Sequence, residues 1–165
     1  FYYYHECYNP KSRLILVGNY EGMERYYLRL KRFVAKNKIK NVIFTGHISF
    51  NEILAYYSVA NLFLCESMHE GFGVPLVESM IFGVPVLAYN SSAIAETLGT
   101  GGIVHTLTDS SQTAELMNGI LTDLNKQQEI KENQRKELKR FDEEKMTEHL
   151  LEFINKNKLP GDENG

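Results

Sequence analysis

The sequence predicts an α/β fold, in which a parallel β-sheet is flanked by helices. Short apolar runs alternate with longer amphipathic stretches, and the runs begin at residues 13, 41, 61, 84 and 102. The resulting steps of 28, 20, 23 and 18 residues are typical of strand-plus-helix units. Runs such as Leu14–Val17 are apolar throughout, as expected of strands covered on both faces. The expected strands are Arg13–Val17, Asn41–Thr45, Asn61–Cys65, Val84–Tyr89 and Gly102–Val104.

Two helices are expected before the second strand. The aromatic opening, Phe1–Tyr4 with Tyr8, fits the core-facing surface of a helix better than a platform for stacking a ligand. In the second helix, basic residues recur at steps of four, three and four, so they share one face. This basic face consists of Arg25, Arg29, Arg32 and Lys36, and the residues expected to face the core are Tyr26, Leu30, Phe33 and Val34. The basic face is either a solvated surface or a peripheral contact with anionic lipid headgroups.

Capping signals give the starts and ends of the other helices. A Ser-x-x-Glu capping box begins one, a proline begins and a glycine ends the next, and Asp109 begins a third. The expected ranges are Ser49–Val59, Pro75–Gly83, Asp109–Leu124, Gln127–Lys139 and Asp142–Lys156. The last two form a helical C-terminal tail. Residues 1–157 are expected to be one domain, and residues 158–165 a disordered end.

Composition excludes several classes of protein. The 165 residues carry 18 Lys and Arg against 21 Asp and Glu, a net charge of −3, which argues against a nucleic-acid binder. No apolar run approaches the roughly 18 residues of a membrane span. Two cysteines cannot build a disulfide framework, so a cytoplasmic setting is expected. The five histidines have no ligand-like spacing, and no metal cofactor is expected. The chain opens on Phe1 rather than Met, which suggests a fragment of a longer protein.

The segment His69–Met80 is the most informative part of the sequence. It follows an expected buried strand and opens a helix, and open α/β sheets bind ligands at this carboxyl end of their strands. Gly71 and Gly73 let the loop backbone approach a ligand closely or adopt positive φ. The backbone N–H groups of Gly73, Val74 and Leu76 are the expected donors to an anion such as a phosphate.

Two glutamates in this segment each have two possible roles. Glu78 is expected in the first turn of an otherwise apolar helix, where a carboxylate either favours the helix dipole or accepts hydrogen bonds from ribose hydroxyls. Glu70 is either a surface acid or a carboxylate beside a reacting sugar carbon.

The pair Glu70 and Glu78 stands in the sequence Glu-Gly-Phe-Gly-Val-Pro-Leu-Val-Glu-Ser-Met. This segment resembles the paired-glutamate motif of retaining nucleotide-sugar glycosyltransferases with the GT-B fold, the glycosyl transferases group 1. The resemblance extends over about residues 10–125. Its supporting segments are Leu16–Gly18, Val42–Ile48, Tyr56–Leu62, Ala95–Thr97 and the pair Gly101-Gly102.

The resemblance implies one Rossmann-like half of a two-domain GT-B enzyme, the half that binds a nucleotide-diphosphate sugar. Glu78 would bind the ribose, and Glu70 would be the catalytic residue beside the donor sugar. The backbone of Gly71, Phe72, Gly73 and Val74 would contact the sugar and phosphates, and His47 and Ile48 would lie near the nucleobase. The acceptor would be bound mainly by a separate N-terminal domain. The sugar would be transferred with retained configuration, in polysaccharide or glycolipid synthesis.

The sequence also departs from the family pattern. The arginine and lysine that clamp the diphosphate in the family cannot be placed, and the chain begins after the first expected strand. Glu66 and Ala95 stand where the family has prolines, and Asn19 breaks a glycine pair. The missing cations suggest that this chain alone is inactive. Two alternatives stay open: a non-catalytic nucleotide-binding or interaction module, and a sugar-nucleotide epimerase of the same fold.

Overall fold

The computed structural model describes residues 1–69 and 71–141 of the chain. The α/β architecture is confirmed, and each expected strand lies within two residues of its expected position. The strands are β1 (Leu14–Val17), β2 (Val42–Gly46), β3 (Phe63–Cys65), β4 (Val86–Tyr89) and β5 (Ile103–His105). The helices are α1 (Tyr2–Cys7), α2 (Glu24–Lys36), α3 (Phe50–Val59), α4 (Val74–Ile81), α5 (Ile94–Leu98), α6 (Ser110–Thr122) and α7 (Leu124–Glu137), followed by the 3₁₀ turn η1 (Leu138–Phe141).

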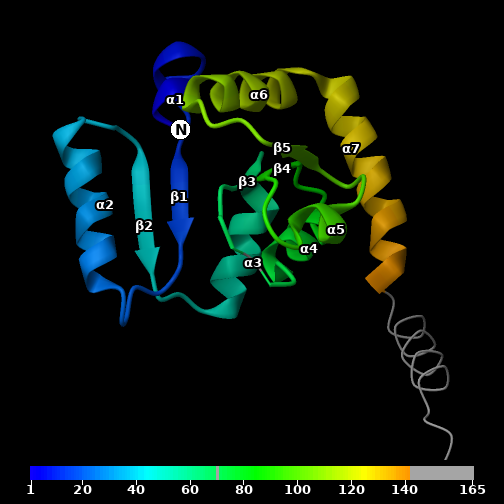
Figure 1. Cartoon of the computed structure of the whole chain (residues 1–165), viewed down its shortest axis with the longest axis horizontal. Helices are drawn as coiled ribbons and strands as arrows, with labels where there is room; N and C mark the ends of the chain where they lie inside the picture. Colours follow the sequence, from blue (N-terminus) through cyan, green and yellow to red (C-terminus); the bar gives the residue numbers. More distant parts are fainter. Residues whose placement is uncertain (70, 142–165) are drawn as a thin grey trace, which may run out of the picture.

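The strands form two parallel sheets rather than one continuous sheet. β1 pairs with β2, starting from Leu14 opposite Val42. β4 lies between β3 and β5, with Leu87 opposite Leu64 on one side and Ile103 on the other. β1 and β3 are not paired with each other, so each has a free edge. Figure 1 shows the two sheets side by side, with α1 and α6 above them and α7 at the outer side of the larger sheet.

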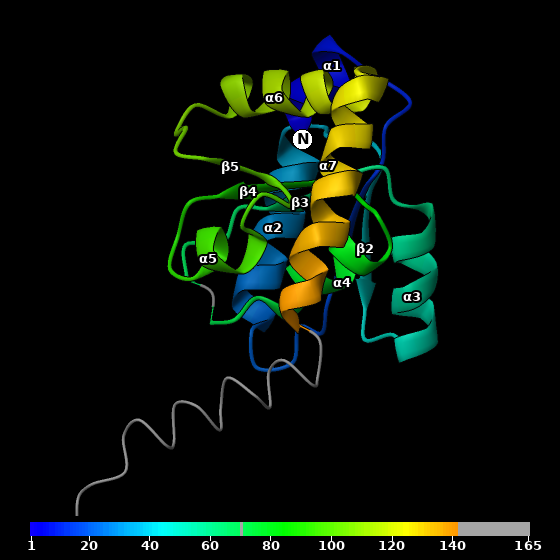
Figure 2. The same ribbon diagram turned by 90° about the vertical axis from the view of Figure 1, so that its right-hand side faces the viewer.

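The three-stranded sheet is covered on both faces, because alternate residues of β4 enter different core clusters. Leu87 packs in a cluster with residues of α1, α6 and α7, which are Tyr4, Ala114, Met117, Ile120 and Ile130. Val86 and Ala88 pack against α4 and α5, through Leu76, Met80, Ile94 and Leu98. Figure 2 shows α7 crossing in front of these strands and α4 behind it. This enclosure explains the continuously apolar sequence of β4.

The two-stranded sheet is much less enclosed, and here two expectations about burial are wrong. No residue from 6 to 56 is buried. On α2, Tyr26 is 55% exposed and Phe33 is 59% exposed, although both were expected to face the core. Tyr27 packs instead, with its ring stacked 4.3 Å from that of Tyr20. A sheet of two strands is too narrow to cover both flanks of a helix, so only a thin stripe of α2 finds partners.

The opening helix is confirmed, but only part of it packs. In α1, Tyr4 is buried, whereas Tyr2, Tyr3 and the following Tyr8 are exposed. The six-residue α1 lies against α6 along one stripe, which leaves the rest of its aromatic surface outside the core.

Most capping signals act as expected. The Ser49–Glu52 capping box is present at α3, and the Asp109 side chain accepts a hydrogen bond from the Ser111 N–H at α6. The next helix, however, begins at Leu124 rather than Gln127, because the Asp123 side chain caps it. The expected helix Asp142–Lys156 and the tail 158–165 lie outside the described residues.

Candidate functional site

The loop between β3 and α4 leaves the carboxyl edge of the three-stranded sheet and turns sharply into α4. Gly73 caps α4 with a left-handed conformation, φ 74° and ψ 50°. A Cβ at this position would lie 2.8 Å from Leu76 Cδ1, so the turn needs glycine both for its φ and for its space. Gly71 has open space around it and no positive φ, so of these two positions only Gly73 requires glycine.

Three hydrogen bonds from other parts of the sheet edge hold this loop. They are Ser91 Oγ to Ser67 O (2.6 Å), Thr97 Oγ1 to Phe72 O (2.7 Å) and His105 Nε2 to Glu66 Oε1 (3.0 Å). The donors come from the β4–α5 connection, from α5 and from the end of β5. These bonds attach the loop to the packed half of the molecule, in addition to the local hydrogen bond from Ser67 Oγ to His69 O at 3.0 Å.

The start of α4 has backbone N–H groups without an acceptor among the described residues, though these are not all of the expected donors. Leu76 N donates to Gly73 O at 2.8 Å, so it is already engaged. Neither Gly73 N nor Val74 N has an acceptor among residues 1–69 and 71–141. Two N–H groups at the positive end of a helix are suited to an anionic oxygen.

Glu78 is the fifth residue of α4, and it is half-buried. The expected first-turn position is therefore wrong, since α4 begins at Val74 and its first turn carries no acid. The favourable effect of the helix dipole fades beyond the first turn, so it does not explain this carboxylate. Glu78 Oε2 instead accepts a hydrogen bond from the Tyr57 hydroxyl of α3 at 2.9 Å. Sequence reasoning did not single out Tyr57, which lies 21 residues away along the chain.

An open pocket of about 480 Å³ lies at the carboxyl ends of β1 and β2. Its lining residues are Asn19, Tyr20, Glu21, Tyr27, Phe44, Thr45, Gly46 and His47. The expected residue His47 is thus in the pocket, but Ile48 and the loop Gly71–Val74 are not part of its lining. The pocket and the loop belong to different sheets, so the structure does not gather all the expected site residues into one cavity.

Similarity to known proteins identifies the family of this chain. Residues 5–137 match the sequence profile of a family described as Glycosyl transferases group 1. The chain belongs to this family. It is 33% identical over 103 residues to the serotype-specific mannosyltransferase WbdA of Escherichia coli, a match that covers 62% of this chain and 12% of WbdA. It is 32% identical over 83 residues to the O-antigen chain mannosyltransferase RfbU of Salmonella typhimurium, covering 50% of this chain and 24% of RfbU.

A solved structure of the same fold contains a sugar nucleotide. The crystal structure of Anabaena Alr3699/HepE in complex with UDP-glucose superposes with a TM-score of 0.76 and 25% sequence identity. The superposition covers 89% of this chain and 42% of the HepE chain. The group 1 chain therefore spans less than half of each of these three proteins.

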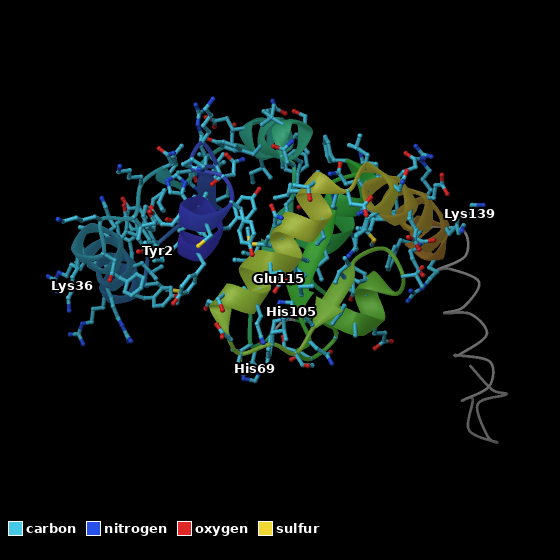
Figure 3. All side chains as sticks on the ribbon, turned by 90° about the horizontal axis from the view of Figure 1, so that it is seen from above. Tyr2, Lys36, His69, His105, Glu115 and Lys139 are labelled. Atoms are coloured by element: carbon cyan, nitrogen blue, oxygen red, sulfur yellow. The ribbon has the colours of Figure 1, made fainter. Side chains whose placement is uncertain are left out.

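The pair Glu66 and His105 was not foreseen in this group 1 chain. His105 is buried, and its Nδ1 accepts a hydrogen bond from Leu107 N at 3.2 Å. Because a backbone N–H can only donate, the proton of the neutral imidazole lies on Nε2 and points to Glu66. The sequence feature that could have indicated this pair is Glu66, which stands where the resembling family has proline. Figure 3 shows His69 and His105 on one side of the molecule, far from Lys36 at the end of α2.

Several expectations for this group 1 chain are not tested by the structure. Glu70 lies outside the described residues, so its catalytic role stays a prediction. The basic face of α2 is exposed, and its contact with lipid likewise stays a prediction. In the described ranges, no group of three or more His, Cys, Asp and Glu side chains gathers as metal ligands would. No helix within those ranges is long and apolar enough to span a membrane.

Proposed function

We propose that this chain is the donor-binding domain of a glycosyltransferase that moves a sugar from a nucleotide-diphosphate sugar to an acceptor with retained configuration. The observation that carries the proposal is the turn from β3 into α4. There, the N–H groups of the left-handed Gly73 and of Val74 have no acceptor within the described residues, and the half-buried carboxylate of Glu78 follows about one turn later. Donors for phosphate and an acceptor for ribose hydroxyls are the two functions that a sugar nucleotide requires.

The relatives support the class of substrate. HepE is described with UDP-glucose bound, and WbdA and RfbU are described as mannosyltransferases, RfbU for the O-antigen chain. A role in building a bacterial surface polysaccharide is therefore the proposal that these relatives favour for the whole protein.

The proposed sugar transfer depends on contacts that position the donor. The loop backbone of Gly71–Val74 contacts the sugar and the diphosphate, and Glu78 accepts hydrogen bonds from the ribose. The acceptor hydroxyl attacks from the face that the diphosphate leaves, so the configuration is retained. Catalysis then depends on positioning and on stabilising the charge of the leaving diphosphate. Glu70 beside the donor sugar completes this proposal, with no metal ion.

The free edges of β1 and β3 support a further part of the proposal. A parallel strand between them would join the two sheets into one. We assign this position to the first strand of the donor-binding domain, which residues 1–157 lack, and we expect that strand, the diphosphate-clamping cations and the acceptor domain in the same longer protein. On this proposal the 165-residue chain binds donor weakly and transfers nothing.

The test is a titration of the 165-residue chain with UDP, GDP and ADP, followed by NMR. We expect saturable shifts with one nucleotide, centred on the loop before α4. Glu78→Ala is expected to weaken that binding at least about tenfold, because it removes a partly buried acceptor of charged hydrogen bonds. Glu115→Ala is the control, since Glu115 is an exposed glutamate of α6 with no hydrogen bond or ion pair to the other described residues.

Equal affinities for the wild type and Glu78→Ala would contradict the proposed site. A complete enzyme that released free sugar-nucleotide isomers without an acceptor would instead be an epimerase. A complete protein that bound nucleotide but turned over no donor with any acceptor would be a binding module.

A further inference from the structure

We propose that Tyr57 is a positioning residue for Glu78, holding one carboxylate oxygen so that the other faces the ribose of the donor. This inference rests on the proposed function, because it concerns the glutamate that is proposed to bind the donor. Tyr57 comes from α3 and Glu78 from α4, so the contact also joins the two helices that flank β3 in the chain.

The phenol ring of Tyr57 is fixed by packing. Tyr57 is 9% exposed, and it is the first buried residue after His5 in the described chain. Its ring stacks on Phe82 with centroids 5.6 Å apart, and it lies 6.1 Å from the ring of Phe63. A ring held by two aromatic neighbours presents its hydroxyl at one place, with little loss of side-chain entropy on binding.

The hydroxyl proton is committed to the carboxylate. Tyr57 Oη lies 2.9 Å from Glu78 Oε2 and 3.4 Å from Pro75 O. A hydroxyl has one proton, so the shorter contact to the charged oxygen takes it. Glu78 Oε1 accepts no hydrogen bond from residues 1–69 or 71–141, so it is available to a ligand.

The hydroxyl also remains a donor at all ordinary pH values. Burial, and then the hydrogen bond to Glu78, raise the pKa of Tyr57 above its usual value. The phenol is therefore protonated at neutral pH, where its proton is available to the Glu78 carboxylate. A carboxylate held in this way has its orientation fixed before the ribose binds.

The experiment compares ribonucleotide and 2′,3′-dideoxynucleotide binding to the 165-residue chain, using whichever of UDP, GDP and ADP binds the wild type. Tyr57→Phe keeps the ring and removes only the hydroxyl. We expect it to weaken binding of the ribonucleotide about three- to tenfold, which corresponds to the loss of one hydrogen bond to a charged group. The affinity for the dideoxynucleotide should be unchanged. Tyr56→Phe removes the neighbouring hydroxyl, which has no hydrogen bond to any described residue, and should change neither affinity.

Equal losses for both nucleotide forms, or no loss for either, would overturn the role of Tyr57. Failure of Glu78→Ala to weaken binding would overturn the proposed function first, so the two failures are distinguishable. Should Tyr57→Phe not fold, ¹³Cζ-tyrosine labelling of the wild type replaces it. The Tyr57 resonance should then shift on adding the ribonucleotide and not the dideoxy form, and a Tyr57 signal that responds equally to both would contradict the inference.

Discussion

The two sheets of this chain repeat the same strand–helix–strand order and differ in what surrounds them. β3, β4 and β5 have helices on both faces, and Val86, Leu87 and Ala88 are fully buried. β1 and β2 lie beside α2, and no residue from 6 to 56 is buried. Both sheets have parallel strand ladders, so the layers of helices around a sheet, and not its backbone hydrogen bonds, decide whether a core forms.

This difference divides the proposed site between two kinds of support. The loop before α4 is held by the enclosed sheet, through hydrogen bonds from β5, α5 and the β4–α5 connection, and Glu78 is held by the Tyr57 hydroxyl of α3. The pocket with His47 belongs to the two-stranded sheet. On the proposed function, the loop that contacts the donor sugar would lie on the enclosed half of the molecule and the nucleobase pocket on the less stable half.

A matched pair of leucines tests the comparison most severely. Leu87 of β4 is 0% exposed and Leu16 of β1 is 37% exposed. We expect Leu87→Ala to lower the free energy of unfolding by about 3 kcal/mol, through lost burial and a residual cavity. Leu16→Ala is expected to cost less than about 1 kcal/mol, because its side chain already meets water. Urea unfolding measures both, and equal losses would show that the two sheets share one cooperative core.

A glycine pair tests how firmly the enclosed half holds the loop. Gly73→Ala is expected to cost about 1–2 kcal/mol, the usual penalty of a left-handed backbone for a residue with a Cβ. The new Cβ would also press on Leu76 Cδ1. Gly71→Ala has open space and no such φ, so it should cost less than about 0.5 kcal/mol. A loop that tolerated both equally in thermal unfolding would be free to rearrange, contrary to its three hydrogen bonds.

The strands are predicted about equally well in both halves, whereas burial is predicted less well in the open half. The five strands and the caps at Ser49 and Asp109 are local patterns, and the structure has them. The burial of Phe33 was predicted wrongly, because it depends on the width of the sheet beneath α2, and no local pattern records that width. Asp123 was missed as a cap because it lies between two helical stretches that read as nearly continuous.

The site was predictable in its loop and not in its supports. The residues of the loop before α4 lie within one short segment, so spacing and glycine content identify them. The residues that hold them are distant in the sequence: Tyr57 is 21 residues from Glu78, and His105 is 39 residues from Glu66. Contacts over such separations follow from the folded topology, and a single sequence does not record them.

A smaller effect tests whether charge as well as burial holds the enclosed half together. Glu137 of α7 accepts from Thr100 N at 2.9 Å and from Arg140 Nη1 at 2.6 Å. These bonds, the Thr100 backbone bond first, lower the pKa of Glu137 below its usual value. The stabilisation is therefore complete above the unfolded pKa of about 4.3 and is lost as the pH falls through the lower folded pKa. Glu137→Gln is expected to cost about 1 kcal/mol at pH 7.

The pH dependence separates this contribution from simple packing. The difference in unfolding free energy between wild type and Glu137→Gln should persist from pH 7 down to about 4.3 and vanish at lower pH. A difference that stayed constant to pH 2 would mean that the side chain acts through its shape alone.

The smallest effect is expected on α2, within the open half. Phe33 is 59% exposed, and serine has a helix propensity close to that of phenylalanine, so Phe33→Ser should change the free energy of unfolding by no more than about 0.5 kcal/mol. On the same helix, Tyr27 stacks 4.3 Å from Tyr20 and lies 5.5 Å from Phe44, so Tyr27→Ser should cost about 2 kcal/mol. Urea unfolding followed by circular dichroism measures both variants. A large loss of unfolding free energy for Phe33→Ser would mean that the outer face of α2 is covered in solution. The contrast between the two sheets would then reflect a missing partner rather than the fold of this chain.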